Sequence, residues 1–444
     1  MSKQFSKFTL HTQYLQAQFI SPTILSLGLV FSVASQLRLP GLPLGLGELL
    51  LVLWLISTIG APSNWRNSTL YAALSLIFIG ILFLGVGYFL TPYPPSHTRP
   101  PALHDALAYA FSSVIAINYA RLFYRYDNSL PSALLHAFLL SVIFAVVLGV
   151  FARDVTGIDA VWRDPPYRWK HLSDNPNQFA LLALPLPFLA LHLIRQYKGA
   201  RLLIPGIAGL MALILGWYSQ SDALILSWIV GGLVLIIALL ITRPRNVLPN
   251  NLRTNFSARV RFLTIVLILL LTGITIWQSR NKAAEMIAGI QIIQQNQAAI
   301  IGSSDCISGS KYNQASVRLC LWRNALVVIQ YAPLTGFGPG PHSGLVKPFQ
   351  GEEAHNTLLD WGSQTGLIGL AALVTYSGWV LWQVARQRRY ELVAMLLALY
   401  CFSMFHLVLR QPLFWIIPLL AVELAKRSIL NISNTDLRNQ NSQV

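Results

Sequence analysis

Residues 202–241 read LLIPGIAGLMALILGWYSQSDALILSWIVGGLVLIIALLI, which is two apolar runs separated by the short polar turn YSQSD. Each run has close to the roughly 20 residues that an α-helix needs to cross the hydrocarbon core of a bilayer. A helix suits that solvent because it satisfies its backbone hydrogen bonds within its own segment. This stretch therefore predicts two transmembrane helices joined by a tight connection.

Apolar runs of this kind recur along the whole chain and predict about twelve transmembrane helices. Of the 444 residues, 54% are hydrophobic and 11% are charged, whereas a soluble domain carries about a quarter charged residues. The composition excludes an ordinary soluble domain and predicts an all-α integral membrane protein. The runs lie near residues 17–37, 45–61, 69–90, 103–120, 131–151, 178–194, 202–218, 222–241, 261–278, 366–384, 391–409 and 411–425.

The positive charges predict how these helices are oriented. Short basic connections occur at residues 195–201, 243–261 and 386–389, and the other connections are longer and rich in Pro, Gly, Asn and Asp. Cytoplasmic loops are the ones that carry an excess of Lys and Arg. We therefore expect both termini in the cytoplasm and one large periplasmic loop at residues 279–362, in a bacterial inner membrane. The net charge of +16 fits this topology, and no nucleic-acid partner is expected because no recognisable nucleic-acid-binding module accompanies it.

Two of the three cysteines, Cys306 and Cys320, fall in the expected periplasmic loop, and Cys401 falls in an expected helix. Disulfides persist in oxidising compartments such as the periplasm. Two cysteines in one such loop are consistent either with a Cys306–Cys320 disulfide or with two separate thiols. Mass spectrometry of peptides from this loop under non-reducing conditions distinguishes the two.

The same loop contains a predicted helix with an arginine and a tryptophan on one face. In ASVRLCLWRNALVVIQYAPLTGFGPGPHSGL (315–345), Arg318 and Trp322 are four residues apart, and an apolar stripe at helical spacing follows them. Pro333 is expected to end this helix. The next residues predict a tight turn with exposed backbone, formed around Gly336, Gly338 and Gly340.

A histidine and an asparagine follow this turn. In GEEAHNTLLDWGSQTGLIGL (351–370), His355 and Asn356 stand just before a helix that is expected to re-enter the membrane near Gly366. Histidine titrates near neutral pH, and asparagine is a preferred residue at a helix N-terminus. The loop therefore contains a candidate general base directly beside a candidate helix cap.

The order R-x-x-x-W, then A-P-L-x-G-x-G-P-G, then A-H-N-x-x-L followed by G-L-I-G-L, resembles the shared domain of bacterial O-antigen ligases and the related Wzy-type polysaccharide polymerases. Upstream, HLSDNPNQFALLALPLPFLAL (171–191) is similar to that family's asparagine-bearing outer loop, and LGWYSQSDALI stands at its serine-rich helix start. The resemblance implies a fold like that of membrane-embedded glycosyltransferases of the C superfamily. It divides the chain into N-terminal helices at 1–170, a ligase-like domain at 171–425 and a cytoplasmic tail at 426–444.

The resemblance also implies a reaction, the transfer of a glycan from an undecaprenyl-diphosphate carrier to an acceptor hydroxyl on a glycan or lipid. Arg318 is expected to bind the departing diphosphate, because a guanidinium stays protonated and its fork matches phosphate oxygens. His355 is expected to take the hydroxyl proton as general base. No metal and no cofactor is expected, since the donor is already activated. Further expected substrate-binding residues are Arg323, Glu353, Asn356, Gly338, Asn177 and Arg280.

Several of these residues also have structural interpretations. Asn356 can cap the helix that follows it, and either Asn175 or Asn177 can cap the helix near residue 178. Gly338 and its neighbours can also be present simply to build the turn, without contacting a substrate. Glu353 can be a solvated acid or can orient the imidazole of the nearby histidine.

One position departs from the family pattern. The family often has an arginine directly after the serine-rich stretch, where this chain has Asp222. If that arginine normally holds the diphosphate, another cation has to replace it here. The candidates are Arg280, Lys282 and the cluster Arg163, Arg168 and Lys170.

Two other classes of function compete with glycan transfer. A transporter of a small solute such as bicarbonate is one, but the polar residues concentrate in a single loop and form no relay through the helices. A structural membrane scaffold is the other, and it leaves the R-x-x-x-W and H-N elements unexplained. Within the glycosyltransferases, ligase and polymerase share this domain, and the sequence does not separate them.

Overall fold

The computed structural model describes residues 21–38, 44–61, 67–93, 99–122, 129–151, 162–163, 168–241, 314–343 and 352–441. These residues are mainly helical, and their one sheet is a two-stranded antiparallel hairpin of β1 (Trp162–Arg163) and β2 (Arg168–Trp169). The helices are α2 (Ser21–Phe31), α3 (Leu46–Thr58), α4 (Ser68–Leu90), α5 (Leu103–Arg121), α6 (Ser129–Phe151), α8 (Pro176–Ala183), α9 (Leu186–Ile194), α10 (Leu203–Tyr218), α11 (Asp222–Ile241), α15 (Gln314–Tyr331), α16 (Thr357–Ala385), α17 (Tyr390–Ser403) and α18 (Pro412–Asn441), with short 3-10 turns at Ser35–Leu37 and Gly199–Leu202.

The expected apolar runs have helical counterparts, except the run at 261–278, which lies outside the described residues. Among the described residues, five helices are long and apolar enough to cross a membrane, so the expected number of about twelve spans stays a prediction. These five are Ser68–Leu90, Ser129–Gly149, Pro176–Ile194, Gly199–Tyr218 and Thr357–Ala385.

Two boundaries differ from the prediction. The run at 391–409 is helical only to Ser403, because the residues that follow include His406 and Arg410, whose polar side chains are costly inside a membrane-spanning helix. At the other end of the chain, α18 continues to Asn441 and so passes through most of the expected tail.

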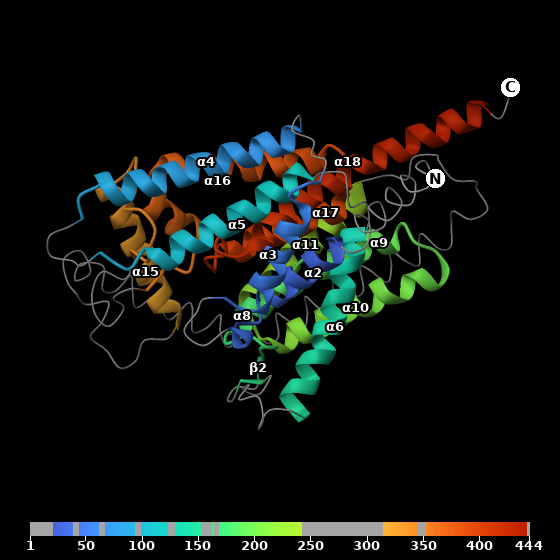
Figure 1. Cartoon of the computed structure of the whole chain (residues 1–444), viewed down its shortest axis with the longest axis horizontal. Helices are drawn as coiled ribbons and strands as arrows, with labels where there is room; N and C mark the ends of the chain where they lie inside the picture. The colour runs from blue at the N-terminus through green and yellow to red at the C-terminus, as the bar shows by residue number, and fades with distance from the viewer. Residues whose placement is uncertain are drawn as a thin grey trace, which may run out of the picture.

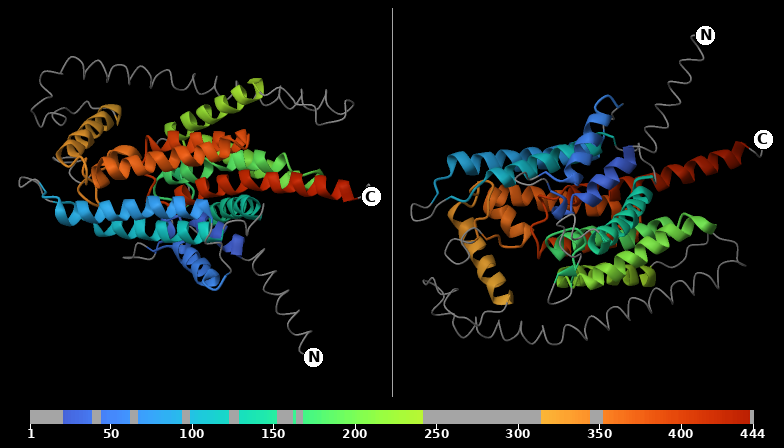
Figure 2. Two further views of the ribbon diagram at one scale, coloured as in Figure 1. Left: turned by 90° about the horizontal axis from the view of Figure 1, so that it is seen from above. Right: turned by 60° about the horizontal axis from the view of Figure 1, so that its bottom comes forward.

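Helix α17 and the first part of α18 lie at the centre of the molecule, and the rest of α18 projects from the bundle toward the C-terminus, as Figures 1 and 2 show. Helix α11 packs along α17, and α18 contacts α5, α16 and α17. Small residues permit close approach between helices: a Cβ on Gly80 of α4 would lie 2.9 Å from the ring of Trp361 in α16. Close packing through small residues is typical of helices that associate in a bilayer.

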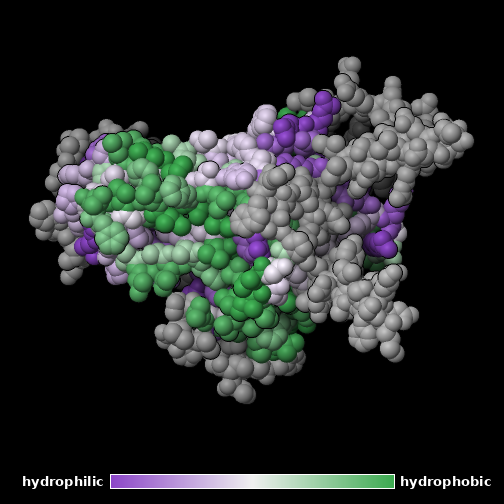
Figure 3. Space-filling model, turned by 45° about the horizontal axis from the view of Figure 1, so that its top comes forward, coloured by the Kyte–Doolittle hydropathy of each residue, from purple (hydrophilic) through white to green (hydrophobic). Residues whose placement is uncertain are grey.

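The outer helices turn apolar side chains outward. Helix α4 exposes Tyr71, Phe78, Ile81 and Phe89, and α3, α6 and α10 also expose large hydrophobic residues. Figure 3 shows the resulting broad hydrophobic face. A soluble monomer rarely exposes such a surface, so this face is suited to contact with lipid.

One end of the bundle collects segments that are far apart in the sequence. Helix α15 packs against the start of α16, as Figure 1 shows. The backbone of α16 is interrupted at Gly366, which has φ 67° and ψ −172°. The first part of α16, between Asn356 and this interruption, therefore forms a short separate helical segment directly after His355.

Candidate functional site

His355 occupies a strained backbone conformation that its neighbours fix. Its φ is +51°, a value that residues other than glycine rarely adopt. The carboxylate of Asp360 accepts hydrogen bonds from the backbone N–H of Ala354 at 2.8 Å and of Asn356 at 3.2 Å. One buried acid thus binds the backbone on both sides of the histidine. Strained residues held in this way cluster at functional sites.

Two further contacts complete the support of this segment. The indole N–H of Trp322 in α15 donates to the carbonyl of Ala354 at 2.9 Å. The side chain of Asn356 accepts from the N–H groups of Leu358 and Leu359 at 3.0 and 3.2 Å, which is the geometry of an N-cap. The expected capping role of Asn356 is confirmed, and its expected contact with substrate stays a prediction.

The predicted residues Arg318 and His355 come together around a third residue, His406. This histidine lies in the connection between α17 and α18, and its ring packs on Phe402 with ring centres 4.7 Å apart. Burial first, and then the electrostatic influence of Arg318 and of His355, lowers the pKa of His406 to about 3. The hydroxyl of Thr357 donates to the carbonyl of His406 at 2.6 Å, and the ring of Trp322, one turn after Arg318, lies 6.4 Å from the ring of Phe405. The structure therefore places Arg318 and His355 at the same end of the bundle, beside one imidazole.

Arg168, from the β1–β2 hairpin, brings a further positive charge to the surroundings of His406. It also contributes to the lowered pKa of His406. Its Nε donates to the carbonyl of Ser219 at 2.8 Å, in the turn just before Asp222 begins α11. One of the cations expected to replace the family's missing arginine thus lies directly against the serine-rich turn. Lys170 of the same cluster is 6% exposed.

The glycine-rich turn packs its backbone against two helices. The N–H groups of Phe337 and Gly338 donate to the carbonyls of Ser363 and Gln364 at 3.0 and 2.9 Å. Gly338 has φ +83°, and a Cβ there would lie 2.6 Å from the Cβ of Tyr88 in α4. The turn is therefore a close backbone junction with α16 and α4, and substrate binding by Gly338 stays a prediction.

The other predicted residues are distributed as follows. Arg323 is partly buried on α15. Glu353 forms an ion pair with Arg410. Asn175 caps α8 by accepting from the N–H of Asn177 at 2.9 Å, which confirms that one of this pair is a cap. The remaining positions lie outside the described side chains: Arg163, Arg280, Lys282, Cys306 and Cys320.

Four residues of this site were not predicted as functional: His406, Arg410, Asp360 and Asp105. A signal for the first was present, because His406 falls within the expected span at 391–409, where a histidine is unfavourable unless it serves a function, and Arg410 stands directly after that span. Asp105 and Asp360 each stand in the first turn of a helix, where acids are common, so their positions alone carry no functional signal.

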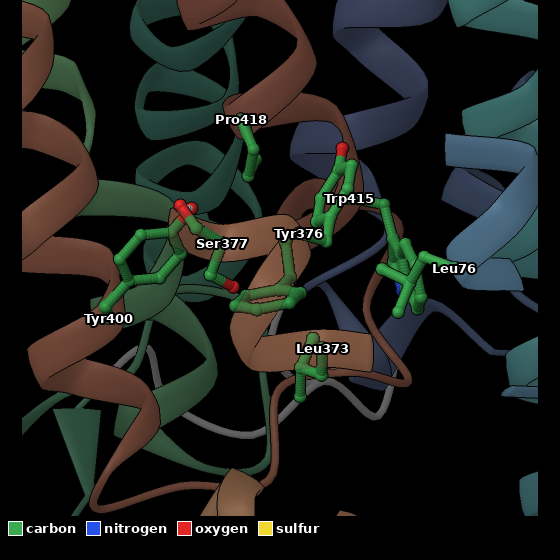
Figure 4. A pocket seen from close by; sticks show the side chains of 8 residues that line it. Leu76, Leu373, Tyr376, Ser377, Tyr400, Trp415 and Pro418 are labelled. Atoms are coloured by element: carbon green, nitrogen blue, oxygen red, sulfur yellow. Dashed lines mark hydrogen bonds between the residues drawn. The ribbon is translucent and has the colours of Figure 1, made fainter. Parts of the chain in front are cut away.

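A small apolar pocket lies between α4, α16, α17 and α18 (Figure 4). The hydroxyl of Tyr400 donates to the carbonyl of Ser377 at its rim, at 3.4 Å. No group of His, Cys, Asp and Glu suited to a metal ion occurs among the described residues. The pocket is lined by Leu76, Leu373, Tyr376, Ser377, Tyr400, Phe414, Trp415 and Pro418.

Fold and surface together define a multi-pass, all-α membrane protein. Residues 206–374 match the family model described as O-antigen ligase, the family that the sequence motifs resemble. No match is found among curated proteins. The domain supports a membrane glycosyltransferase of the O-antigen ligase or polymerase type and gives no support to the transporter alternative. Arg168, His406 and Arg410 lie outside the matched range.

Proposed function

We propose that this protein transfers a glycan from an undecaprenyl-diphosphate carrier to an acceptor hydroxyl, at the periplasmic face of a bacterial inner membrane. The observation that carries the proposal is the junction between α15, which carries Arg318, and the residue just before His355, made by the hydrogen bond from Trp322 to the carbonyl of Ala354 at 2.9 Å. A leaving diphosphate requires a lasting positive charge, and an attacking hydroxyl requires a nearby base. Both kinds of group are present at one end of this bundle.

In the proposed reaction, the acceptor oxygen attacks the anomeric carbon of the donor sugar. The bond between that carbon and the diphosphate oxygen breaks, and its electron pair leaves with the diphosphate. The hydroxyl proton passes to the imidazole of His355. The guanidinium of Arg318 binds the departing phosphate oxygens, with Arg323 as a second donor.

Arg168 fits a supporting role in this scheme. It lies against the carbonyl of Ser219, close to the place where the family often has an arginine and this chain has Asp222. A cation supplied from the hairpin can therefore replace one supplied from the helix start. Arginine suits this replacement because its charge persists when it is partly buried.

The test is a complementation experiment in a strain that lacks this protein. His355→Ala and Arg318→Ala are each expected to abolish long-chain surface polysaccharide on a gel while membrane insertion stays normal. The loss of a general base typically costs a factor of about 10²–10⁴ in rate, which is enough to remove the product. Matched controls are His136→Ala and Arg201→Ala, which change exposed residues on α6 and at Gly199–Leu202 and should leave the product unchanged.

Wild-type amounts of long-chain glycan with both site variants would refute glycan transfer through these residues. Solute uptake by vesicles that contain the purified protein would favour the transporter alternative. The product also separates the two members of the class: glycan attached to a lipid core indicates a ligase, and a longer carrier-linked chain indicates a polymerase.

A further inference from the structure

Arg410 joins the segment that contains His355, residues 352–360 and called here the His355 segment, to the distant helix α5. It lies in the connection between α17 and α18, with 21% of its side chain exposed. Its Nη1 contacts Oδ1 of Asp105 in the first turn of α5 at 2.7 Å, and its Nη2 contacts the carboxylate of Glu353. The second acid stands two residues before His355. One guanidinium thus connects two acids that belong to separate parts of the chain.

The charges around Arg410 favour its ion pairs with Glu353 and Asp105. Burial lowers the pKa of Arg410, but the neighbouring carboxylates of Glu353 and Asp105 have the larger combined effect and raise it above the usual arginine value. The guanidinium therefore stays charged. Its planar fork can serve both acids at once, which the single ammonium of a lysine does less well.

Other contacts support the backbone on both sides of His355. Asp360 and Trp322 hold the peptide groups of Ala354 and Asn356. Two side chains tie residues 352–360 to the connection between α17 and α18: Glu353 pairs with Arg410, and the hydroxyl of Thr357 donates to the carbonyl of His406 at 2.6 Å. The direction in which His355 faces thus depends on backbone hydrogen bonds to α15 and α16. It also depends on the ion pair with Arg410 in the connection between α17 and α18 (residues 404–411).

We infer that Arg410 is a positioning residue, which clamps the Glu353 side of the His355 segment against Asp105 of α5 and so holds His355 in place. This inference rests on the proposed function for its effect on transfer. In this inference Glu353 acts as the carboxylate that Arg410 holds, and the two residues form one clamp. A small misplacement of a catalytic group can cost about 100-fold in rate, so a clamp of this kind has a measurable effect.

The test uses the full-length protein in lipid nanodiscs and two independent readouts. The first is amide hydrogen exchange of the peptide that contains residues 352–360, measured by mass spectrometry. Arg410→Gln is expected to speed exchange of the Ala354 and Asn356 amides by about tenfold, because a charge-assisted bond no longer restrains the segment. Glu353→Gln should have the same effect, and the double variant should add little, since both changes remove one link.

The second readout is glycan transfer in the complementation strain, where Arg410→Gln should reduce product and Arg410→Lys should restore part of it. The matched control is Arg195→Gln, which breaks a similar pair, Arg195 Nη1 to Glu391 Oε2 at 2.6 Å. Glu391 lies at the start of α17, at the other end of that helix from His406. This control should leave exchange in 352–360 unchanged.

Faster exchange together with reduced transfer, in Arg410→Gln but not in Arg195→Gln, supports the inference. Unchanged exchange overturns it, and so does wild-type transfer despite faster exchange. If the wild type itself transfers no glycan, the proposed function fails, and the exchange readout still decides whether the clamp exists.

Discussion

The indole Nε1 of Trp322 donates a hydrogen bond to the backbone carbonyl of Ala354, at 2.9 Å. This bond joins the R-x-x-x-W element on α15 to the residue just before His355. Arg318 stands one turn before Trp322 on the same helix. The tryptophan therefore fixes how the helix that carries the candidate diphosphate-binding arginine meets the segment that carries the candidate base.

Trp322→Phe tests this junction, because it keeps an aromatic ring and removes the N–H donor. A lost hydrogen bond of this kind costs about 0.5–1.5 kcal/mol of stability, and we expect a larger proportional loss of glycan transfer. Thermal unfolding in detergent and the polysaccharide gel measure the two effects. Trp382→Phe is the control, since Trp382 is an exposed residue of α16. Equal behaviour of the two variants would contradict the prediction.

The positive φ of His355 predicts a separation of stability from activity. Glycine adopts φ +51° without the penalty of about 1–2 kcal/mol that other residues pay in the left-handed region. His355→Gly should therefore unfold at a higher temperature than His355→Ala, while both variants lose transfer. The comparison of the two thermal midpoints in the same detergent is the measurement. Identical midpoints would show that the backbone at this position relaxes in the variants.

The glycine-rich turn predicts a strong steric effect at Gly336. Its φ is +63°, and a Cβ there would lie 2.4 Å from the carbonyl carbon of Gln364. Gly336→Ala is expected to destabilise the protein by about 2–4 kcal/mol through strain and overlap. The yield of folded protein on size-exclusion chromatography measures the effect. Gly85→Ala is the control, because a Cβ there has no neighbour within 4 Å, and a well-folded Gly336→Ala variant would be inconsistent with this junction.

Two buried histidines predict that acid destabilises the protein. Burial lowers the pKa of His171 and of His342 to about 4, compared with an unfolded value near 6.5. Between these two values the unfolded chain binds more protons than the folded chain. The contribution of these two histidines to stability is therefore complete above about pH 6.5 and falls as the pH drops toward 4. The buried carboxyl of Asp360, whose pKa burial raises to about 7, acts in the opposite direction.

Thermal midpoints at pH 7.5 and pH 5 measure this acid sensitivity. His342→Gln should reduce the difference between the two midpoints, since glutamine does not titrate. The exposed His136 provides the control, because His136→Gln should leave the difference unchanged. An equal acid sensitivity in the wild type and in His342→Gln would refute the assignment.

Much of the fold could be predicted from the sequence because the signals are local. Apolar runs predicted the helices, Pro333 predicted the end of α15 at Tyr331, and Asn356 predicted the start of α16. Each of these signals depends on a few adjacent residues and on the bilayer as solvent. The boundary of α17 was wrong because the hydropathy of residues 404–409 hides the short connection that contains His406.

The sequence by itself determined the membrane class, the helices and the pairing of Arg318 with His355 in one expected loop. Only the tertiary structure decided that Arg168, His406 and Arg410 lie beside them, and the bond from Arg410 to Asp105 spans 305 positions. The physical reason lies in how membrane helices pack. Lipid-facing and core-facing apolar side chains are alike in hydropathy, so the pattern along the chain does not specify which helices become neighbours.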